Sequence, residues 1–172
     1  MNDIKERAIE ACRLLNDFVG DIIAATRVPE ALEQSGILDQ RALRVTNRMC
    51  FSHMIITLSK WAELYERYAS LIPEDCRPAC KKLRKEIDRR KIRGFRNKCV
   101  GHIWDKDVNR PLTEGELDSY INDIVGDDPL VFVEWLNNPR ANEFPNTVVS
   151  IVETTRDRLR EVFVITNNDL FG

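Results

Sequence analysis

The apolar residues of this chain recur at intervals of three and four, and this period constrains the fold more than any other feature of the sequence. It runs through residues 3–26, through residues 39–71 and again through residues 146–166. A period near 3.6 residues lines up side chains on one face of a helix, whereas a strand requires strict alternation. The sequence therefore predicts an all-α protein without a β-hairpin.

Proline and aspartate residues set the expected ends of the first two helices. The helix that starts near residue 3 is expected to end near Pro29, because proline removes a backbone donor and clashes with the preceding turn. Asp39 is placed to cap the second helix, and Pro73 should close it near residue 71.

A threonine and a glutamate mark the clearest helix start in the second half of the chain. Thr113 and Glu116 have the spacing of a capping box, and the helix that begins there should end near Gly126. Residues 128–136 favour a short helix, although their β-branched content leaves a strand as the alternative. Together the segments predict a bundle of four long antiparallel helices with a short helical insertion before the last.

Length and composition agree with one helical domain over residues 1–172. Hydrophobic residues make up 43% of the chain and charged residues 31%, which excludes wholly disordered and collagen-like classes. Charges interrupt every apolar run near the N-terminus, so neither a secretory nor a transit segment is expected. No stretch reaches the roughly 18 apolar residues that a membrane span requires. The five cysteines are odd in number and dispersed, which favours reduced thiols and a cytoplasmic location.

One segment concentrates the positive charge. Residues 77–98, called the basic segment below, hold eleven of the 26 Lys and Arg but only two of the 28 Asp and Glu. A helix is expected from residue 75 to about 101, with a bend near Gly94 or a change of packing partner, because its two apolar groups lie about a quarter turn apart. The charge asymmetry indicates a surface that faces a polyanion, or else a solvated helix face.

Histidine occurs twice, and the two positions differ in their surroundings. His53 lies in an apolar run, which favours a hydrogen-bonded core or interface residue. His102 follows the basic segment and stands six residues after Arg96 and five after Asn97. A cation, an amide and an imidazole so close together at a helix end can bind a phosphate and move a proton.

The pair Arg96-Asn97 followed by His102 resembles the signature of HEPN domains, an arginine with a polar neighbour and a histidine five or six positions on. The stretch Phe-Arg-Asn-Lys is most similar to members from abortive-infection systems. The resemblance implies a small all-α bundle in which the signature lies at the end of a long helix and two copies meet at a dimer interface.

The same resemblance implies an activity, RNA cleavage without a metal. A ribose 2′-hydroxyl would attack the adjacent phosphate and leave a cyclic phosphate and a 5′-hydroxyl. Arg96 would hold the phosphate, Asn97 would position it or the imidazole, and His102 would transfer protons. No cofactor is implied. The partners would be RNA, a second copy and, for a toxin or phage-defence effector, an antitoxin or other regulatory protein.

Further side chains are candidates for substrate contact. Lys98, Arg93 and Arg89 supply positive charge, and Trp104 is a candidate for stacking on a nucleobase. In a regular helix, residues 96 and 102 lie about 9 Å apart along the axis and about 120° apart around it, so one chain offers a poor site. Two copies related by a twofold axis would complete it.

Two alternatives to a nuclease remain open at this stage. The chain could be a catalytically inactive binding or adaptor module that recognises nucleic acid, a nucleotide or an acidic protein. His102 could also serve only to cap its helix, with Arg96 paired to loop acids such as Asp105 or Asp107.

A zinc site is the third alternative. Cys76, Cys80, Cys99 and His102 supply the donor types of a Cys3His site. A continuous helix from residue 80 to 99 would hold the two pairs of ligands about 30 Å apart, so no metal is expected.

Overall fold

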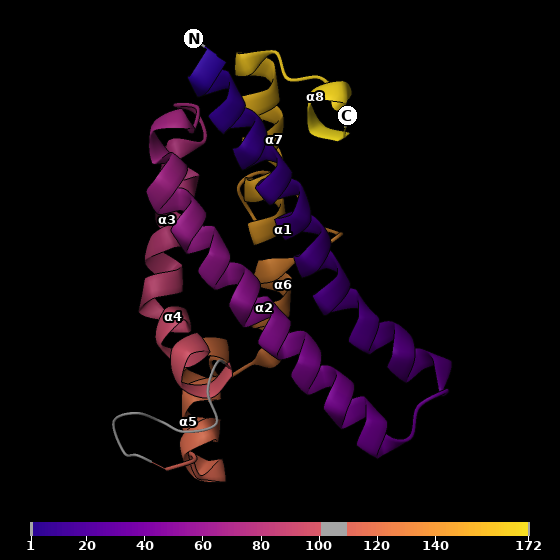
Figure 1. Ribbon diagram of the computed structural model, residues 1–172. Coiled ribbons are helices and arrows are strands. Elements are labelled where there is room, and N and C mark those ends of the chain that lie inside the picture. Colours follow the sequence, from indigo (N-terminus) through magenta and orange to yellow (C-terminus); the bar gives the residue numbers. More distant parts are fainter. Residues whose placement is uncertain (1, 101–109, 172) are drawn as a thin grey trace.

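The computed structural model describes residues 2–100 and 110–171, and it confirms the all-α bundle (Figure 1). The α-helices are α1 (Asn2–Ser35), α2 (Gln40–Tyr68), α3 (Arg77–Arg89), α4 (Ile92–Phe95), α5 (Glu114–Val125), α6 (Pro129–Leu136), α7 (Val148–Phe163) and α8 (Asn167–Phe171). A three-residue 3-10 turn, η1 (Ala69–Leu71), follows helix α2. A π-helical turn, η2 (Arg96–Val100), follows helix α4. No helix in the described ranges is long and apolar enough to cross a membrane.

Helices α1 and α2 form an antiparallel pair that organises the bundle (Figure 1). Helix α1 packs against α2 along one side and against α7 along another, while α3 and α4 pack on α2. Buried side chains from all eight helices join in one hydrophobic cluster, with Ile22, Leu58 and Trp61 among its members. The amphipathic stripes seen in the sequence therefore bury one another, as their period predicts.

The capping signals in the sequence are confirmed at three helix starts. The Asp39 carboxylate accepts a hydrogen bond from the Ala42 amide at 2.7 Å. Thr113 and Glu116 form the expected capping box at the start of α5. Asp128 caps α6 by accepting from the Leu130 amide, so residues 129–136 are a helix and not a strand.

The expectation that the first helix ends near Pro29 is wrong, because α1 continues through this proline to Ser35. A proline inside a helix removes one hydrogen bond and costs about 3 kcal/mol. Helix α1 packs against α2 and α7, and tertiary packing of this kind supplies most of the stability of a helix, so one proline is tolerated.

This extension creates a projecting element that we call the α1–α2 arm, residues 26–53. None of its residues is buried. The last buried residue of α1 before the arm is Ala25, and the first buried residue of α2 after it is Met54. The arm includes exposed apolar residues such as Ile37 and Met49, which are 79% and 64% accessible. In Figure 1 it extends past the body of the bundle at the lower right.

The basic segment is not one helix, and its break lies at Lys91 rather than at Gly94. Helix α3 ends at Arg89, and Lys91 adopts a left-handed backbone with φ of 53° before α4 begins at Ile92. The residue before the break explains its position. Arg90 donates to the backbone carbonyls of Ile124 and Val125 and so ties the end of α3 to α5.

The C-terminal region differs from the expectation in its last element. Helix α7 ends at Phe163, since Val164 adopts a left-handed backbone with φ of 50°, and the additional helix α8 follows. Thr166 and Asp169 form a reciprocal cap, in which each backbone N–H donates to the other side chain. This Thr-x-x-Asp spacing is a helix-start signal that the sequence analysis did not use.

Candidate functional site

The residues predicted to form the site lie at the end of the basic segment. Arg96, Asn97 and Lys98 belong to the turn η2, which follows α4. His102 and Trp104 lie outside the described residues, as do Asp105 and Asp107.

The turn η2 is π-helical, which changes the spacing expected around Arg96. Residues 96–100 close hydrogen bonds over five positions instead of four. The separation of about 9 Å and about 120° expected between residues 96 and 102 assumes a regular helix, and it stays a prediction because His102 lies outside the described residues. Single π-helical turns are rare and occur often at functional sites.

Arg96 is held by a carboxylate from another helix. Its Nη1 donates to Oε1 of Glu63 on α2 at 2.6 Å. The Arg96 side chain remains 39% accessible, and a guanidinium has five N–H donors. The group is thus fixed in orientation while part of it stays open to a ligand.

Apolar contacts hold the turn against α2 and α5. The Phe95 ring lies edge-on to Phe51 of α2, with centroids 5.9 Å apart, and also contacts Tyr120 of α5. The Lys98 ammonium lies 5.9 Å from the centre of the Tyr120 ring. Asn97 is exposed. The turn is therefore anchored by buried and half-buried rings, with its polar side chains on the outside.

A second carboxylate on α2 holds two more arginines of the basic segment. Glu66 Oε1 accepts from Arg84 at 2.6 Å and from Arg93 at 2.9 Å. The hydrogen bond from Arg84 is the main cause that lowers the pKa of Glu66. Arg93, a predicted substrate contact, is therefore paired within the chain.

Glu86 of α3 likewise holds two arginines of the basic segment. It accepts hydrogen bonds from Arg89 and from Arg90, and these bonds lower its pKa to about 2. Arg89, the other predicted contact on this helix, is 64% accessible but ion-paired. Arg90 is only 12% accessible, and its guanidinium lies 4.9 Å from the centre of the Trp135 ring.

The charge count of the basic segment therefore overstates its free charge. Lys91 pairs with Asp123 of α5 at 2.9 Å, and Arg77 pairs with Glu74 at 3.6 Å. Lysines 81, 82 and 85 on α3 are exposed and have no ion pair or hydrogen bond. Most of the cations that the sequence presents as a polyanion-binding surface are neutralised by neighbouring acids.

His53 lies on the surface of the α1–α2 pair and not in the core. Its Nε2 is 3.1 Å from a carboxylate oxygen of Asp21, and its side chain is 44% accessible. Asp21 also accepts from the Thr57 hydroxyl. His53 therefore does not lie in the core, and the alternative of an interface residue stays a prediction.

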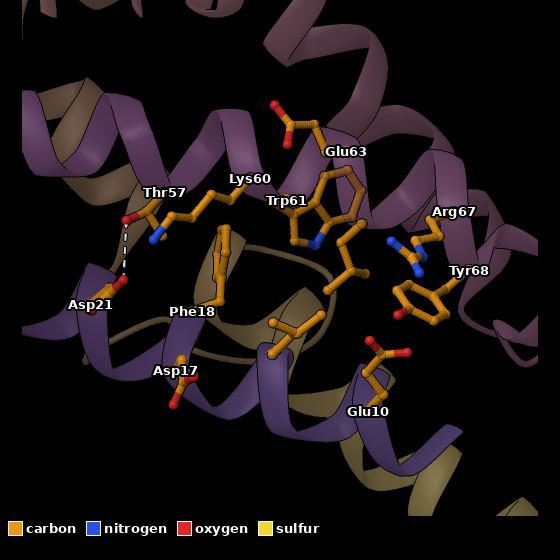
Figure 2. A pocket seen from close by; sticks show the side chains of 12 residues that line it. Glu10, Asp17, Phe18, Asp21, Thr57, Lys60, Trp61, Glu63, Arg67 and Tyr68 are labelled. Atoms are coloured by element: carbon orange, nitrogen blue, oxygen red, sulfur yellow. Dashed lines mark hydrogen bonds between the residues drawn. The ribbon is translucent and has the colours of Figure 1, made fainter. Parts of the chain in front are cut away.

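A groove of about 300 Å³ lies between α1 and α2 (Figure 2). Trp61 and Tyr68 are each 2% accessible and form part of its wall. Burial, together with the neighbouring Glu10 carboxylate, raises the pKa of Tyr68. The lining comprises Glu10, Leu14, Asp17, Phe18, Asp21, Thr57, Lys60, Trp61, Glu63, Leu64, Arg67 and Tyr68.

One residue that lines the groove contacts the predicted site. Glu63 lines the groove and is also the partner of Arg96. The sequence analysis did not find this connection, because residues 63 and 96 are brought together only by the packing of α4 and η2 on α2.

The cysteines of the zinc alternative have other roles where the structure describes them. Cys76 and Cys80 are buried, and Cys80 Sγ lies 3.3 Å from the Thr155 hydroxyl. Burial raises the pKa of Cys80 to about 11, which disfavours the thiolate that a metal requires. No group of three potential metal ligands occurs among the described residues. His102 lies outside them.

Comparisons with known proteins bear on the fold. No family model and no curated protein sequence matches the chain. The chain is similar to a solved structure described as the integron cassette protein Vpc_cass2, from the mobile metagenome of V. paracholerae. The likeness has a TM-score of 0.75 and 23% sequence identity, and it covers 92% of this chain and 97% of that one. At this identity the comparison shows a shared helical fold.

Proposed function

We propose that this chain is a HEPN-like, metal-independent endoribonuclease of the cytoplasm that acts as a homodimer. The observation that supports the proposal is the geometry of Arg96. It lies on a π-helical turn, is oriented by Glu63 at 2.6 Å and keeps part of its guanidinium accessible. A fixed, accessible guanidinium suits the stabilisation of charge on a phosphate during reaction.

The reaction assigned to the site is an internal transfer. The ribose 2′-oxygen forms a bond to phosphorus while the bond from phosphorus to the 5′-oxygen breaks. One imidazole takes the proton of the 2′-hydroxyl, and a second group protonates the leaving 5′-oxygen. The products are a 2′,3′-cyclic phosphate and a 5′-hydroxyl, so atoms and protons balance without a co-reactant.

Each side chain has a distinct part in this scheme. Arg96 binds the phosphate and stabilises the additional negative charge of the transition state. Asn97, which is exposed on the same turn, orients the phosphate or the imidazole. His102 of two copies supplies the base and the acid, which is the reason for a dimer.

A cleavage assay in the presence of EDTA tests this function. The wild-type chain should cleave a single-stranded RNA and leave cyclic phosphate ends. His102→Ala should abolish cleavage, and Arg96→Ala should reduce its rate by about 10²–10³-fold, the usual effect of removing one charge-stabilising group. His53→Ala is the matched control and should retain activity. Equal cleavage by wild type and His102→Ala would contradict the proposal.

A growth assay extends the test to the cell. If the chain is a toxin or phage-defence effector, its expression should slow growth, and His102→Ala should relieve this effect. A partner protein acting as an antitoxin should restore growth with the wild-type chain. Toxicity that persists unchanged in His102→Ala would point to a different activity.

A second candidate function is a catalytically inactive binding or adaptor module. The observation that favours it is the pairing of Arg93 with Glu66 and of Arg89 with Glu86, which engages cations predicted to contact the substrate. This function predicts RNA that is bound but left whole. Its test must avoid Arg90, because that side chain is packed into the fold.

A further inference from the structure

Three arginines on the α2 part of the α1–α2 arm carry charge that no described residue neutralises. Arg41, Arg44 and Arg48 are exposed, and none has an ion pair or hydrogen bond. The nearest acid in the sequence, Asp39, is engaged in capping α2 through the Ala42 amide. A row of unpaired guanidinium groups is a binding surface for phosphates.

The three arginines lie on a defined face of α2. At 100° per residue, Arg44 and Arg48 stand within about 20° and 60° of Phe51 around the helix axis. Phe51 contacts Phe95, the residue immediately before Arg96, with ring centroids 5.9 Å apart. The arginines therefore lie on the same face of α2 that holds the turn η2, but further out along the helix.

The spacing of the three arginines and their exposed position both suit a nucleic-acid strand that runs along this face of α2. Arg41 and Arg48 are about 10.5 Å apart along the helix, so the row spans more than one phosphate of an extended backbone. The arm projects beyond the bundle, so a strand can approach the row without displacing other helices (Figure 1).

We propose that Arg41, Arg44 and Arg48 bind the phosphate backbone of the single-stranded RNA whose scissile phosphate lies at Arg96. This inference rests on the proposed function and adds to it a second contact region, which none of the residues predicted from the sequence includes. The arm adds affinity for the RNA and orients it, and the turn η2 holds the scissile phosphate.

A binding assay tests the role of the arm separately from catalysis. Full-length protein carrying His102→Ala, which blocks cleavage, is titrated into a fluorescently labelled single-stranded RNA at several salt concentrations. Adding R41Q/R44Q/R48Q should weaken binding by about tenfold or more at low salt. It should also reduce the slope of log affinity against log salt by about 2, since each phosphate contact on a single strand contributes about 0.7.

A matched control removes the same number of charges from elsewhere. K81Q/K82Q/K85Q also neutralises three exposed, unpaired cations, but on α3. It should leave the affinity within about twofold and the salt slope unchanged. Circular dichroism of each variant confirms that the fold is retained.

The outcomes separate this inference from the proposed function. Equal affinity and salt slope for the arm variant and its parent would overturn the role of the arm, even if the wild-type chain cleaves RNA. A weaker, less salt-dependent complex for the arm variant would support that role, even if the wild-type chain leaves RNA whole. A wild-type chain that neither binds nor cleaves RNA would overturn both.

Discussion

The basic segment and the α1–α2 arm are both rich in arginine, yet their charges are used in different ways. In the basic segment, Arg84, Arg93 and Arg96 are paired with Glu63 and Glu66, which α2 presents one turn apart. On the arm, Arg41, Arg44 and Arg48 are exposed, and no acid in the described part of the chain pairs with them. Positive charge in a sequence therefore identifies a binding surface only after the neighbouring acids are known.

The difference follows from where each segment lies in the bundle. The basic segment packs across α2, so its side chains meet carboxylates from another helix. Arg90 even enters the bundle and contacts the Trp135 ring. The arm extends past the last buried residues, Ala25 and Met54, and its charges remain in water. Arg84 and Arg93 are held by Glu66, Arg96 is held by Glu63 but stays partly accessible, and the arginines of the arm have no such partner.

The largest expected effect comes from removing the most deeply packed arginine. Arg90→Ala leaves Glu86 with one partner fewer and the carbonyls of Ile124 and Val125 without their donor. We expect a loss of about 3 kcal/mol in the free energy of unfolding. Chemical denaturation measures it. A loss below about 1 kcal/mol would mean that these contacts are not what fixes the end of α3.

The next effect tests whether pairing suppresses RNA binding by the basic segment. Glu66→Gln removes the shared carboxylate of Arg84 and Arg93 and leaves two guanidinium groups with more free charge. RNA affinity should rise about threefold, with a steeper salt dependence, while unfolding loses less than about 1 kcal/mol. Fluorescence anisotropy in the His102→Ala background measures it. Unchanged affinity would show that these cations do not face RNA.

Acid pH offers a smaller effect on the same region. Glu86 has a pKa of about 2 in the folded protein against an ordinary value of 4.5, because Arg89 and Arg90 stabilise its charged form. Its contribution to stability is present above about pH 4.5 and is lost as the pH falls toward 2. Glu86→Gln should cost about 1 kcal/mol at pH 6, and the difference from wild type should vanish near pH 2. Thermal melts across this range measure it, and a difference independent of pH would contradict the assignment.

The smallest effect is expected on the arm. Arg44→Ala removes an exposed side chain without a partner, so the free energy of unfolding should change by no more than about 0.5 kcal/mol. The same denaturation experiment as for Arg90→Ala makes the contrast direct. Strong destabilisation would show that this arginine, like Arg90, belongs to the fold.

Local features of the fold were predictable, because their causes are local. The Thr113–Glu116 capping box and the Asp39 cap depend on residues within one turn, and both occur as expected. The local rule for proline does not predict that α1 continues through Pro29, and the break at Lys91 depends on the contact of Arg90 with α5, 34 residues further along the chain. No pattern around Gly94 indicates that Arg90 is anchored to α5.

The sequence predicts a candidate site at Arg96 and Asn97, but it does not reveal the surroundings of these residues. Their spacing to His102 identifies Arg96 and Asn97 in the sequence. Arg96 and Asn97 both belong to the turn η2. The sequence does not reveal that Glu63 holds Arg96, since 33 residues separate the two. The free arginines of the arm were missed for the same reason, because a sequence shows the charges and not the acids packed against them.

The lack of buried side chains in the arm has a consequence for how this part of the molecule opens. Backbone amides there are protected only by helical hydrogen bonds and by half-buried contacts, so they should exchange with deuterium well before those of the Trp61 region. Local opening of the arm leaves the cluster around Ile22 and Leu58 intact. The tip near Gly36 can therefore change its shape, or accept an inserted loop, at little expense to the rest of the chain.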